Sequence, residues 1–400
     1  MIQQKFLLRD IDMSKTFHRD RFTWLAYLLF AFFAYFLNIL GPITPFLKDE
    51  LGLSYTVSSL HFTAYAVGVL LTGLSGHILI ERVGRRFALW LGAFGISTSA
   101  LILLVGQSAA VTISASFCMG LLGSLILVII PSALSDQHGE LRAVALTESN
   151  VIASLVSTAA PLLVGWAAHF SGGWRLGVGI AAFAPFLILL GLGRTAPPPL
   201  TSHRENSPSA RRTLPLVFWV YWVALVLAVS VEFCMIFWSA DYLENSLGML
   251  KANAAQAVSL FLGGMIIGRL AGSRLVQLFS TRSVVIVSIL VAASGFLLFW
   301  MTNTVALSLF GLFVTGLGVA GLYPLLLSLA IGVTHNNTVL ASARATLASG
   351  TAILGLPLVL GRLADMVGIR LAYGVVGILL ICIFVIVLVT GGKVSGSQPA

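Results

Sequence analysis

Apolar stretches long enough to cross a bilayer constrain the fold of this chain more than any other feature. A membrane-spanning helix needs about 20 apolar residues, and charged or Gly/Pro-rich breaks divide the sequence into twelve such stretches. They lie at residues 22–47, 53–80, 87–106, 109–135, 142–169, 174–193, 214–243, 252–278, 283–303, 305–333, 339–363 and 370–392. Charged residues make up only 9% of the chain, compared with about 25% of soluble domains. We therefore expect an all-α integral membrane protein, and we exclude a soluble enzyme and a nucleic-acid-binding protein.

The longest polar break, at residues 194–213, separates the twelve stretches into two groups of six. It predicts an N-terminal six-helix bundle (22–193), a central loop (194–213) and a C-terminal six-helix bundle (214–392), with tails at 1–21 and 393–400. Seven Gly or Pro residues recur 196 residues later, namely Gly52, Gly68, Gly76, Gly120, Pro161, Gly165 and Gly172. Six helices return the chain to the side on which it started, so both halves have the same orientation. Such a parallel repeat favours a binding site between the halves and alternating access to it.

Lys and Arg are distributed unequally between the two sides of the membrane. If the N-terminus is inside, 16 of the 23 Lys and Arg fall on inner segments and five on outer ones. The positive-inside rule therefore predicts that both termini are cytoplasmic. The membrane is predicted to be the cytoplasmic (inner) membrane of a bacterial type of cell. This bias also explains most of the net charge of +9 without a nucleic-acid partner.

Motifs for metal, nucleotide or nucleophilic chemistry are absent from the sequence. Cys118, Cys234 and Cys382 lie within apolar stretches and lack metal-ligand spacing. No Gly-rich phosphate-binding loop, paired-His metal motif or nucleophile motif occurs. We therefore expect no metal, no cofactor and no enzymatic activity.

Three short motifs link the chain to a known family. The loop between the second and third stretches reads His77-Ile-Leu-Ile-Glu81-Arg82-Val-Gly84-Arg85-Arg86. It resembles the G-x-x-x-D-R-x-G-R-R loop of the major facilitator superfamily of secondary transporters, with His77 and Glu81 in place of Gly and Asp. Two further segments are similar to helix ends in that family, namely Pro161-x-x-x-Gly165 followed by Gly173-Trp174-Arg175, and Gly361-Arg362-Leu-Ala-Asp365. The resemblance covers nearly the whole chain and implies two six-helix bundles around a polar cavity.

Charged residues within the spans are the most specific functional signal, because charge in a bilayer is costly and usually functional or paired. The four clear cases are Glu148, Glu232, Arg269 and Arg344. At about 100° per residue, Glu148 lies away from the polar stripe that contains Asn150.

In the family, helices 2 and 11 meet, as do helices 5 and 8. The resemblance thus implies a cytoplasmic latch in which Glu81 approaches Arg344, and Glu148 approaches Arg269 or Arg274. Permanent scaffold pairs are the alternative. The latch candidates are Glu81, Arg82, Arg85, Arg86, Glu148, Arg269, Arg274 and Arg344.

Glu232 is a different case, because it lies well inside the seventh stretch. A carboxyl group in apolar surroundings favours its neutral form and can change protonation near neutral pH, which is what a proton-coupling group needs. A hydrogen-bonded structural Glu is the alternative. Polar faces on the cavity helices supply further candidates for substrate contact, each of which could instead serve helix packing. They are Tyr35, Asn38, His61, Tyr65, Asn150, Tyr221, Gln256 and Tyr323.

Together these features predict a monomeric secondary transporter that takes up a small organic solute together with protons (symport). Two alternatives remain open. One is proton-coupled efflux (antiport) of drugs or metabolites, which the aromatic content of 10% also suits. The other is a membrane sensor that transports nothing.

Overall fold

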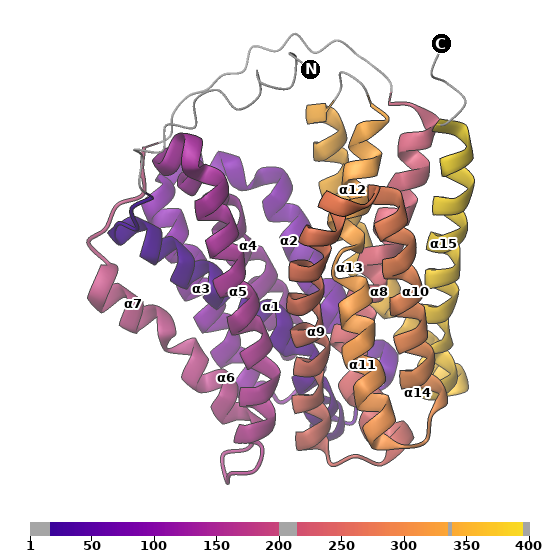
Figure 1. Cartoon of the computed structure of the whole chain (residues 1–400). Coiled ribbons are helices and arrows are strands. Elements are labelled where there is room, and N and C mark those ends of the chain that lie inside the picture. The colour runs from indigo at the N-terminus through magenta and orange to yellow at the C-terminus, as the bar shows by residue number, and fades with distance from the viewer. Residues whose placement is uncertain (1–16, 200–213, 335–337, 395–400) are drawn as a thin grey trace, which may run out of the picture.

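The structure, a computed structural model, describes residues 17–199, 214–334 and 338–394. All regular secondary structure in these ranges is helical. Figure 1 shows two groups of helices side by side, one from each half of the chain. We call the end at which α1 begins and α15 finishes the tail end, and the opposite end the far end.

The N-terminal bundle comprises α1 (Arg21–Leu51), α2 (Tyr55–Val83), α3 (Arg85–Val105), α4 (Ala109–His138), the short 3₁₀ helix η2 (Gly139–Leu141), α5 (Arg142–Ala167), α6 (Trp174–Ala182) and α7 (Ala184–Leu192). The C-terminal bundle comprises α8 (Leu216–Leu247), α9 (Lys251–Leu278), α10 (Thr281–Met301), α11 (Val305–Val319), α12 (Leu322–Gly332), α13 (Thr338–Val367), α14 (Ile369–Ala372) and α15 (Gly374–Val394).

Eleven helical stretches of the described chain are long and apolar enough to cross a membrane. One of them, the 59-residue stretch Ala109–Ala167, contains both α4 and α5. Divided at η2, it gives the twelve spans that the sequence predicts. The prediction of an all-helical membrane protein with twelve spans in two bundles is therefore confirmed.

Local sequence signals set the helix ends. The side chain of Asp20 accepts a hydrogen bond from the backbone N–H of Thr23 at 2.7 Å and so caps the start of α1. Burial alone would raise the pKa of Asp20, but the hydrogen bonds from Thr23 outweigh it and hold that pKa below its usual value. At the other end of α1, Gly52 takes a left-handed conformation with φ of 60°, and Gly248 does the same after α8 with φ of 68°. These two glycines are 196 residues apart, so the repeat includes the helix caps.

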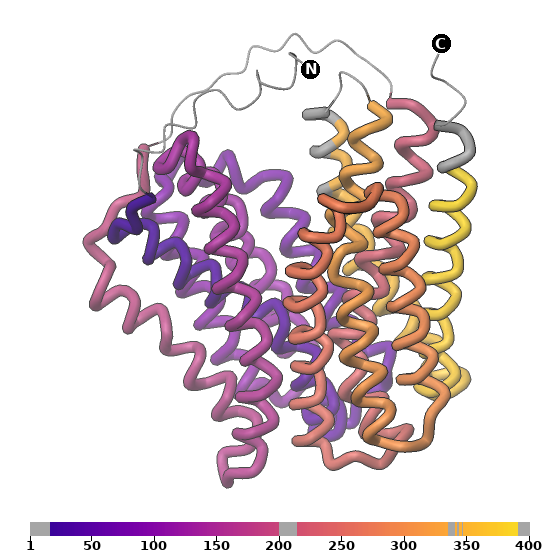
Figure 2. Tube along the Cα trace, viewed as in Figure 1, coloured from indigo at the N-terminus to yellow at the C-terminus, as the bar shows by residue number. Residues whose placement is uncertain are grey.

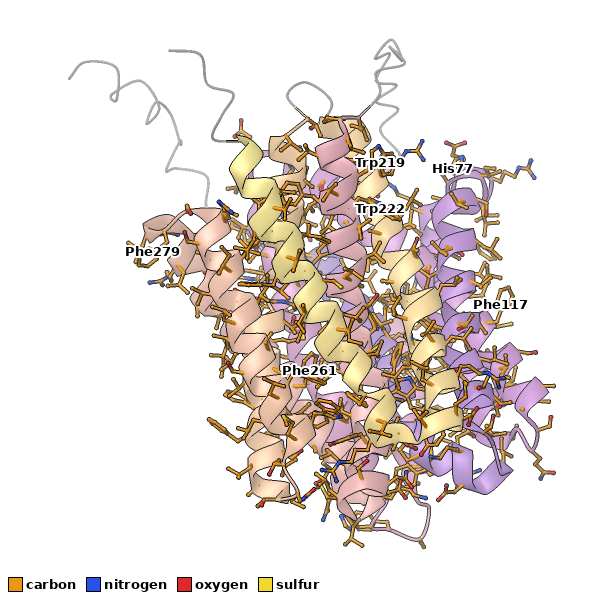
Figure 3. All side chains as sticks on the ribbon, turned by 90° about the vertical axis from the view of Figure 1, so that its right-hand side faces the viewer. His77, Phe117, Trp219, Trp222, Phe261 and Phe279 are labelled. Carbon is orange, nitrogen blue, oxygen red and sulfur yellow. The ribbon has the colours of Figure 1, made fainter. Side chains whose placement is uncertain are left out.

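The repeat extends to the packing of helices within each bundle. A Cβ atom on Gly120 of α4 would clash with the backbone carbonyl of Tyr65 in α2. A Cβ atom on Gly316 of α11 would clash in the same way with the carbonyl of Phe261 in α9, a residue labelled in Figure 3. Both members of the second pair lie 196 residues after those of the first. Glycine recurs at these positions because two backbones touch there.

The bundles meet mainly through two equivalent helix crossings, α5 with α9 and α2 with α13. Gly165 of α5 lies against the backbone of Ala252 in α9, and Gly361 of α13 lies against that of Tyr55 in α2. Because Ala252 and Tyr55 begin their helices at the far end, both close contacts lie at that end. Figure 2 shows the same arrangement, with the halves close together at the far end and apart at the tail end.

Candidate functional site

A cavity of about 210 Å³ lies between the two bundles. Side chains from α1, α4, α5, α8 and α9 line it, so both bundles contribute. Aromatic and aliphatic groups form most of the wall, and the polar groups are Asn38, Asn150, Ser154, Ser157, Glu232 and Arg269. This mixture of apolar walls and a few polar groups is typical of small-molecule sites.

Glu232 and Arg269 are the two charged side chains in the cavity lining. Arg269 Nη2 lies 3.8 Å from Glu232 Oε1, and the two side chains are 48% and 20% exposed. Arg269 Nη1 also donates a long hydrogen bond of 3.4 Å to Ser154 Oγ on α5. Since Arg269 belongs to α9, its guanidinium contacts groups from both bundles.

Two ion pairs join the bundles at the far end. Lys48 of α1 pairs with Asp241 of α8, and their side chains are only 10% and 0% exposed. Lys251 of α9 pairs with Asp49 of α1. We refer to Lys48–Asp241 and Asp49–Lys251 as the far-end ion pairs.

The start of α2 is also bound to the C-terminal bundle. Asp365, near the end of α13, accepts hydrogen bonds from the backbone N–H groups of Tyr55 and Thr56, each 2.8 Å long. A carboxylate at the start of a helix satisfies free N–H groups and the positive end of the helix dipole. This contact therefore adds to the attraction between the bundles at the far end.

An aromatic plug (Phe62, Phe237 and Trp238) joins the two bundles between α2 and α8. The rings of Phe62, from α2, and Phe237, from α8, stack with centroids 4.0 Å apart. Trp238 packs edge-on against Phe62, and all three side chains are fully buried. Phe237 lies about one and a half helical turns beyond Glu232 along α8. The plug therefore adds to the contacts that hold the bundles together on the far-end side of Glu232.

The family model of the Major Facilitator Superfamily matches residues 23–275, which is more than half of the chain. The chain belongs to this superfamily.

Individual relatives are more distant. An uncharacterised MFS-type transporter of Yersinia pestis is 27% identical over 167 residues, which cover 41% of this chain and 44% of that protein. An uncharacterised transporter of Sinorhizobium fredii is 32% identical over 143 residues, covering 35% of this chain and 37% of that protein. The chain thus matches less than half the length of these curated relatives.

Among solved structures, a bacterial homologue of the human lysosomal transporter Spinster, in an inward-facing and occupied conformation, has a TM-score of 0.80. It is 14% identical, and the match covers 97% of this chain and 100% of that chain. A likeness at this level of identity concerns the fold.

Of the eight predicted cavity residues, Asn38 and Asn150 lie in the lining beside Glu232. Each amide donates a hydrogen bond to the carbonyl four residues earlier, Ala34 and Leu146 respectively. Each side chain therefore still has its amide oxygen and a second amide N–H to offer a ligand.

Three of the predicted residues are instead used inside the N-terminal bundle, which corrects the prediction. Tyr35 donates a hydrogen bond of 2.9 Å to the carbonyl of Gly177 on α6. The ring nitrogens of His61 contact the Ser58 carbonyl and, at 2.8 Å, the Thr112 hydroxyl on α4. Tyr65 is 1% exposed. Their polar groups lie on buried faces between helices of one bundle rather than in the cavity.

The other three also lie outside the lining of this cavity. Tyr221 is 3% exposed within α8. Gln256 lies where α9 crosses α5, against Gly165. Tyr323 of α12 is half-buried against the apolar core. These residues serve helix packing in this conformation.

The predicted latch partners are not joined in this conformation. Glu148 binds Arg19, just before α1, through two contacts of 2.6 and 2.8 Å, and accepts a bond from the Tyr27 hydroxyl. Arg269 lies in the cavity beside Glu232 instead, so the pair Glu148–Arg269 is not formed in this conformation. The helical rotation correctly predicts that Glu148 faces away from the cavity, but it does not reveal Arg19 as the partner.

Two further latch candidates hold the N-terminal bundle together. Arg85 forms an ion pair of 2.7 Å with Asp136 of α4, and Arg86 donates a hydrogen bond of 2.8 Å to the carbonyl of Gly193. Both contacts lie within the N-terminal bundle, as the permanent scaffold pairs of the alternative would.

The remaining latch candidates are exposed at the tail end, namely Glu81, Arg82, Arg274 and Arg344. Within the described residues, no ion pair joins Glu81 to Arg344. Figure 3 shows His77 of α2 and Trp222 of α8 at this end, and the indole N–H of Trp222 donates to the backbone carbonyl of Arg344. That contact lies within the C-terminal bundle, so it does not close the tail end.

Proposed function

We propose that this transporter takes up a small organic solute together with protons, and that Glu232 carries the proton. The observation that supports this most directly is the position of Glu232, which lies about half-way along α8 in a cavity shared by both bundles. Arg269 is the charged group that acts on it. A carboxylate that can exchange a cation partner for a proton is suited to coupling.

We further propose that the tail end faces the cytoplasm of a cell whose inner membrane holds this transporter as a monomer. The excess of Lys and Arg on this side supports the orientation, with tails at 1–21 and 393–400 and the loop 194–213 all cytoplasmic. In this orientation the conformation described above is inward-open. The aromatic plug and the far-end ion pairs then close the route to the outside.

In the opposite state of the cycle, the far-end contacts separate and the tail end closes. Transport follows when Glu232 exchanges its proton on alternate sides of the membrane. The far-end ion pairs supply two discrete states, joined or separated, which is what a switching element needs.

The test is transport by purified protein in proteoliposomes. A thermal-shift screen with sugars, organic acids, amino acids and cationic drugs first identifies a compound that stabilises the folded protein. An acidic exterior is expected to drive accumulation of that compound, because symport follows the proton. Efflux by antiport predicts release of preloaded compound under the same gradient, and a sensor predicts no flux of any compound.

Glu232→Gln tests the coupling residue, with Glu148→Gln as the matched control. Glu232→Gln is expected to abolish accumulation driven by the pH gradient. The variant should still exchange labelled for unlabelled compound across the membrane. Glu148→Gln makes the same chemical change outside the cavity and is expected to keep gradient-driven accumulation. Unchanged accumulation in Glu232→Gln would remove this residue from the mechanism.

A further inference from the structure

Arg269 has more hydrogen-bonding capacity than its neighbours use. A guanidinium carries five N–H donors, and the two polar contacts of Arg269 in the cavity are 3.8 Å to Glu232 and 3.4 Å to Ser154. Charge-assisted hydrogen bonds from Arg to a carboxylate are about 2.7–2.9 Å long. Because its side chain is also 48% exposed, the guanidinium is open to a further acceptor from the cavity.

Apart from Glu232, the other polar groups of the lining are uncharged, and much of the wall is apolar. Phe30, Phe33 and Phe233 supply aromatic surface, and Leu262 and Met265 supply aliphatic surface on the same helix as Arg269. A cation set in an apolar wall favours a ligand with one anionic group and an apolar body. Cationic ligands are disfavoured, because Arg269 would repel them once Glu232 is neutral.

We propose that the transported solute is a small monocarboxylate with an apolar body, bound through its carboxylate by Arg269. A guanidinium binds a carboxylate through two parallel hydrogen bonds, which explains the choice of Arg over Lys at this position. This inference rests on the proton-coupled function proposed above for the same site.

The charges of the cavity then balance in both states. In the empty cavity the Glu232 carboxylate and the Arg269 guanidinium neutralise each other. When the carboxylate of the solute takes the place of Glu232 on Arg269, Glu232 binds one proton from water. The lining again carries no net charge, so one proton and one carboxylate cross together without moving charge across the membrane.

Binding to the purified full-length protein in lipid nanodiscs tests the solute class. The probes are benzoate, benzamide and benzylamine, which share a ring and differ in charge, together with hexanoate and hexylamine. Benzoate and hexanoate are expected to raise the melting temperature, and the amide and amines are not. Calorimetry of benzoate binding in buffers of different ionisation enthalpy is expected to detect uptake of roughly one proton.

Variants locate the binding group. Arg269→Gln is expected to weaken benzoate binding at least about tenfold, the loss of one charge-assisted hydrogen bond. Arg269→Lys keeps the positive charge but not the planar guanidinium, so it should weaken benzoate binding less than Arg269→Gln does. Arg142→Gln removes an exposed arginine at the start of α5 and serves as the matched control with unchanged affinity. Glu232→Gln should still bind benzoate, but without proton uptake.

Two results would overturn the inference. One is a benzamide or benzylamine response equal to that of benzoate, and the other is no response to either carboxylate. The proposed proton coupling can be contradicted independently of the proposed solute class. If Arg269 binds benzoate but the unmodified protein takes up no proton, the solute class stands and the role of Glu232 in coupling is contradicted.

Discussion

At the scale of single residues, we expect Arg85 to be a charge that stabilises the fold rather than one that switches between states. Its side chain is 8% exposed and pairs with Asp136, which is 22% exposed. Removing one partner from a buried ion pair leaves an uncompensated charge and costs about 3–5 kcal/mol. Because Asp136 is partly solvated, we expect Asp136→Asn to lower the free energy of unfolding by roughly 1–3 kcal/mol. Thermal unfolding of the purified protein measures this loss.

The same variant distinguishes a scaffold from a latch. If Arg85 and Asp136 form a permanent pair, molecules of Asp136→Asn that remain folded should keep gradient-driven accumulation. Arg86→Gln, which removes a neighbouring exposed arginine, controls for the change in local charge. Lost accumulation in a fully folded Asp136→Asn protein would instead support a switching role for this pair.

The sequence alone singles out the charged residues in the spans, but it does not predict the partners that Glu148 and Arg269 have in this conformation. Glu232 and Arg269 stood out because charge is rare in an apolar stretch. Rotation about one helix axis gives the face of a residue but not the helix opposite, so Arg269 was placed in a latch rather than beside Glu232. Arg19, the partner of Glu148, lies before α1 and outside any periodic pattern.

At the scale of helices, the crossing of α1 and α8 determines how tightly the far end closes. A Cβ atom on Gly41 of α1 would clash with the backbone of Ile236 in α8, so the two helices touch there. Lys48 and Asp241 pair further along the same two helices. The burial of this ion pair depends on the close approach that Gly41 allows.

We expect Asp241→Asn to favour the state that is open at the far end, because it leaves Lys48 buried without its counter-ion. Separation of the bundles would hydrate Lys48 and remove that cost. The measurement is the distance between spin labels at Phe170→Cys and Met301→Cys, two exposed far-end positions in different bundles. Longer distances should become more populated in Asp241→Asn.

A charge swap provides the control for this prediction. Lys48→Asp combined with Asp241→Lys restores an ion pair with the opposite direction, so the double variant should recover shorter distances than either single variant. If Asp241→Asn and the parent protein give the same distance distribution, this ion pair does not hold the far end closed.

The sequence predicted the spans well and the far-end contacts poorly, for a physical reason. Apolar length decides where a helix crosses the membrane, which is why α1 to α15 follow the predicted stretches closely. Lys48 and Asp241 lie at the ends of two such stretches. Charged residues at helix ends are ordinarily solvated, so their presence in the sequence does not predict a buried ion pair. Only the tertiary arrangement of α1 and α8 buries them.

At the scale of the whole molecule, the repeat relates the two helix crossings that join the bundles. The contact of Gly165 in α5 with helix α9 matches the contact of Gly361 in α13 with helix α2. The reason is that α5 and α13 occupy matching positions in the two bundles, as do α2 and α9. The bundles can therefore rock about these paired crossings while each keeps its internal packing. The cavity with Glu232 and Arg269 lies between the bundles, where such motion changes its exposure.

Cysteine labelling tests both the orientation and the closed far end. Asn150 lines the cavity and is exposed. In a background in which Cys118, Cys234 and Cys382 are replaced, Asn150→Cys should react with a membrane-impermeant maleimide in inside-out vesicles and only weakly in intact cells. Adding Asp241→Asn should increase labelling in intact cells severalfold, since it favours opening at the far end.

Arg142→Cys, at the start of α5, provides the reference for the tail end. It should be labelled in inside-out vesicles and protected in intact cells, with or without Asp241→Asn. Labelling of Arg142→Cys in intact cells would mean that the tail end faces outward and would reverse the proposed orientation. Strong labelling of Asn150→Cys in intact cells, with Arg142→Cys protected, would mean that the aromatic plug and the far-end ion pairs do not seal the cavity in the membrane.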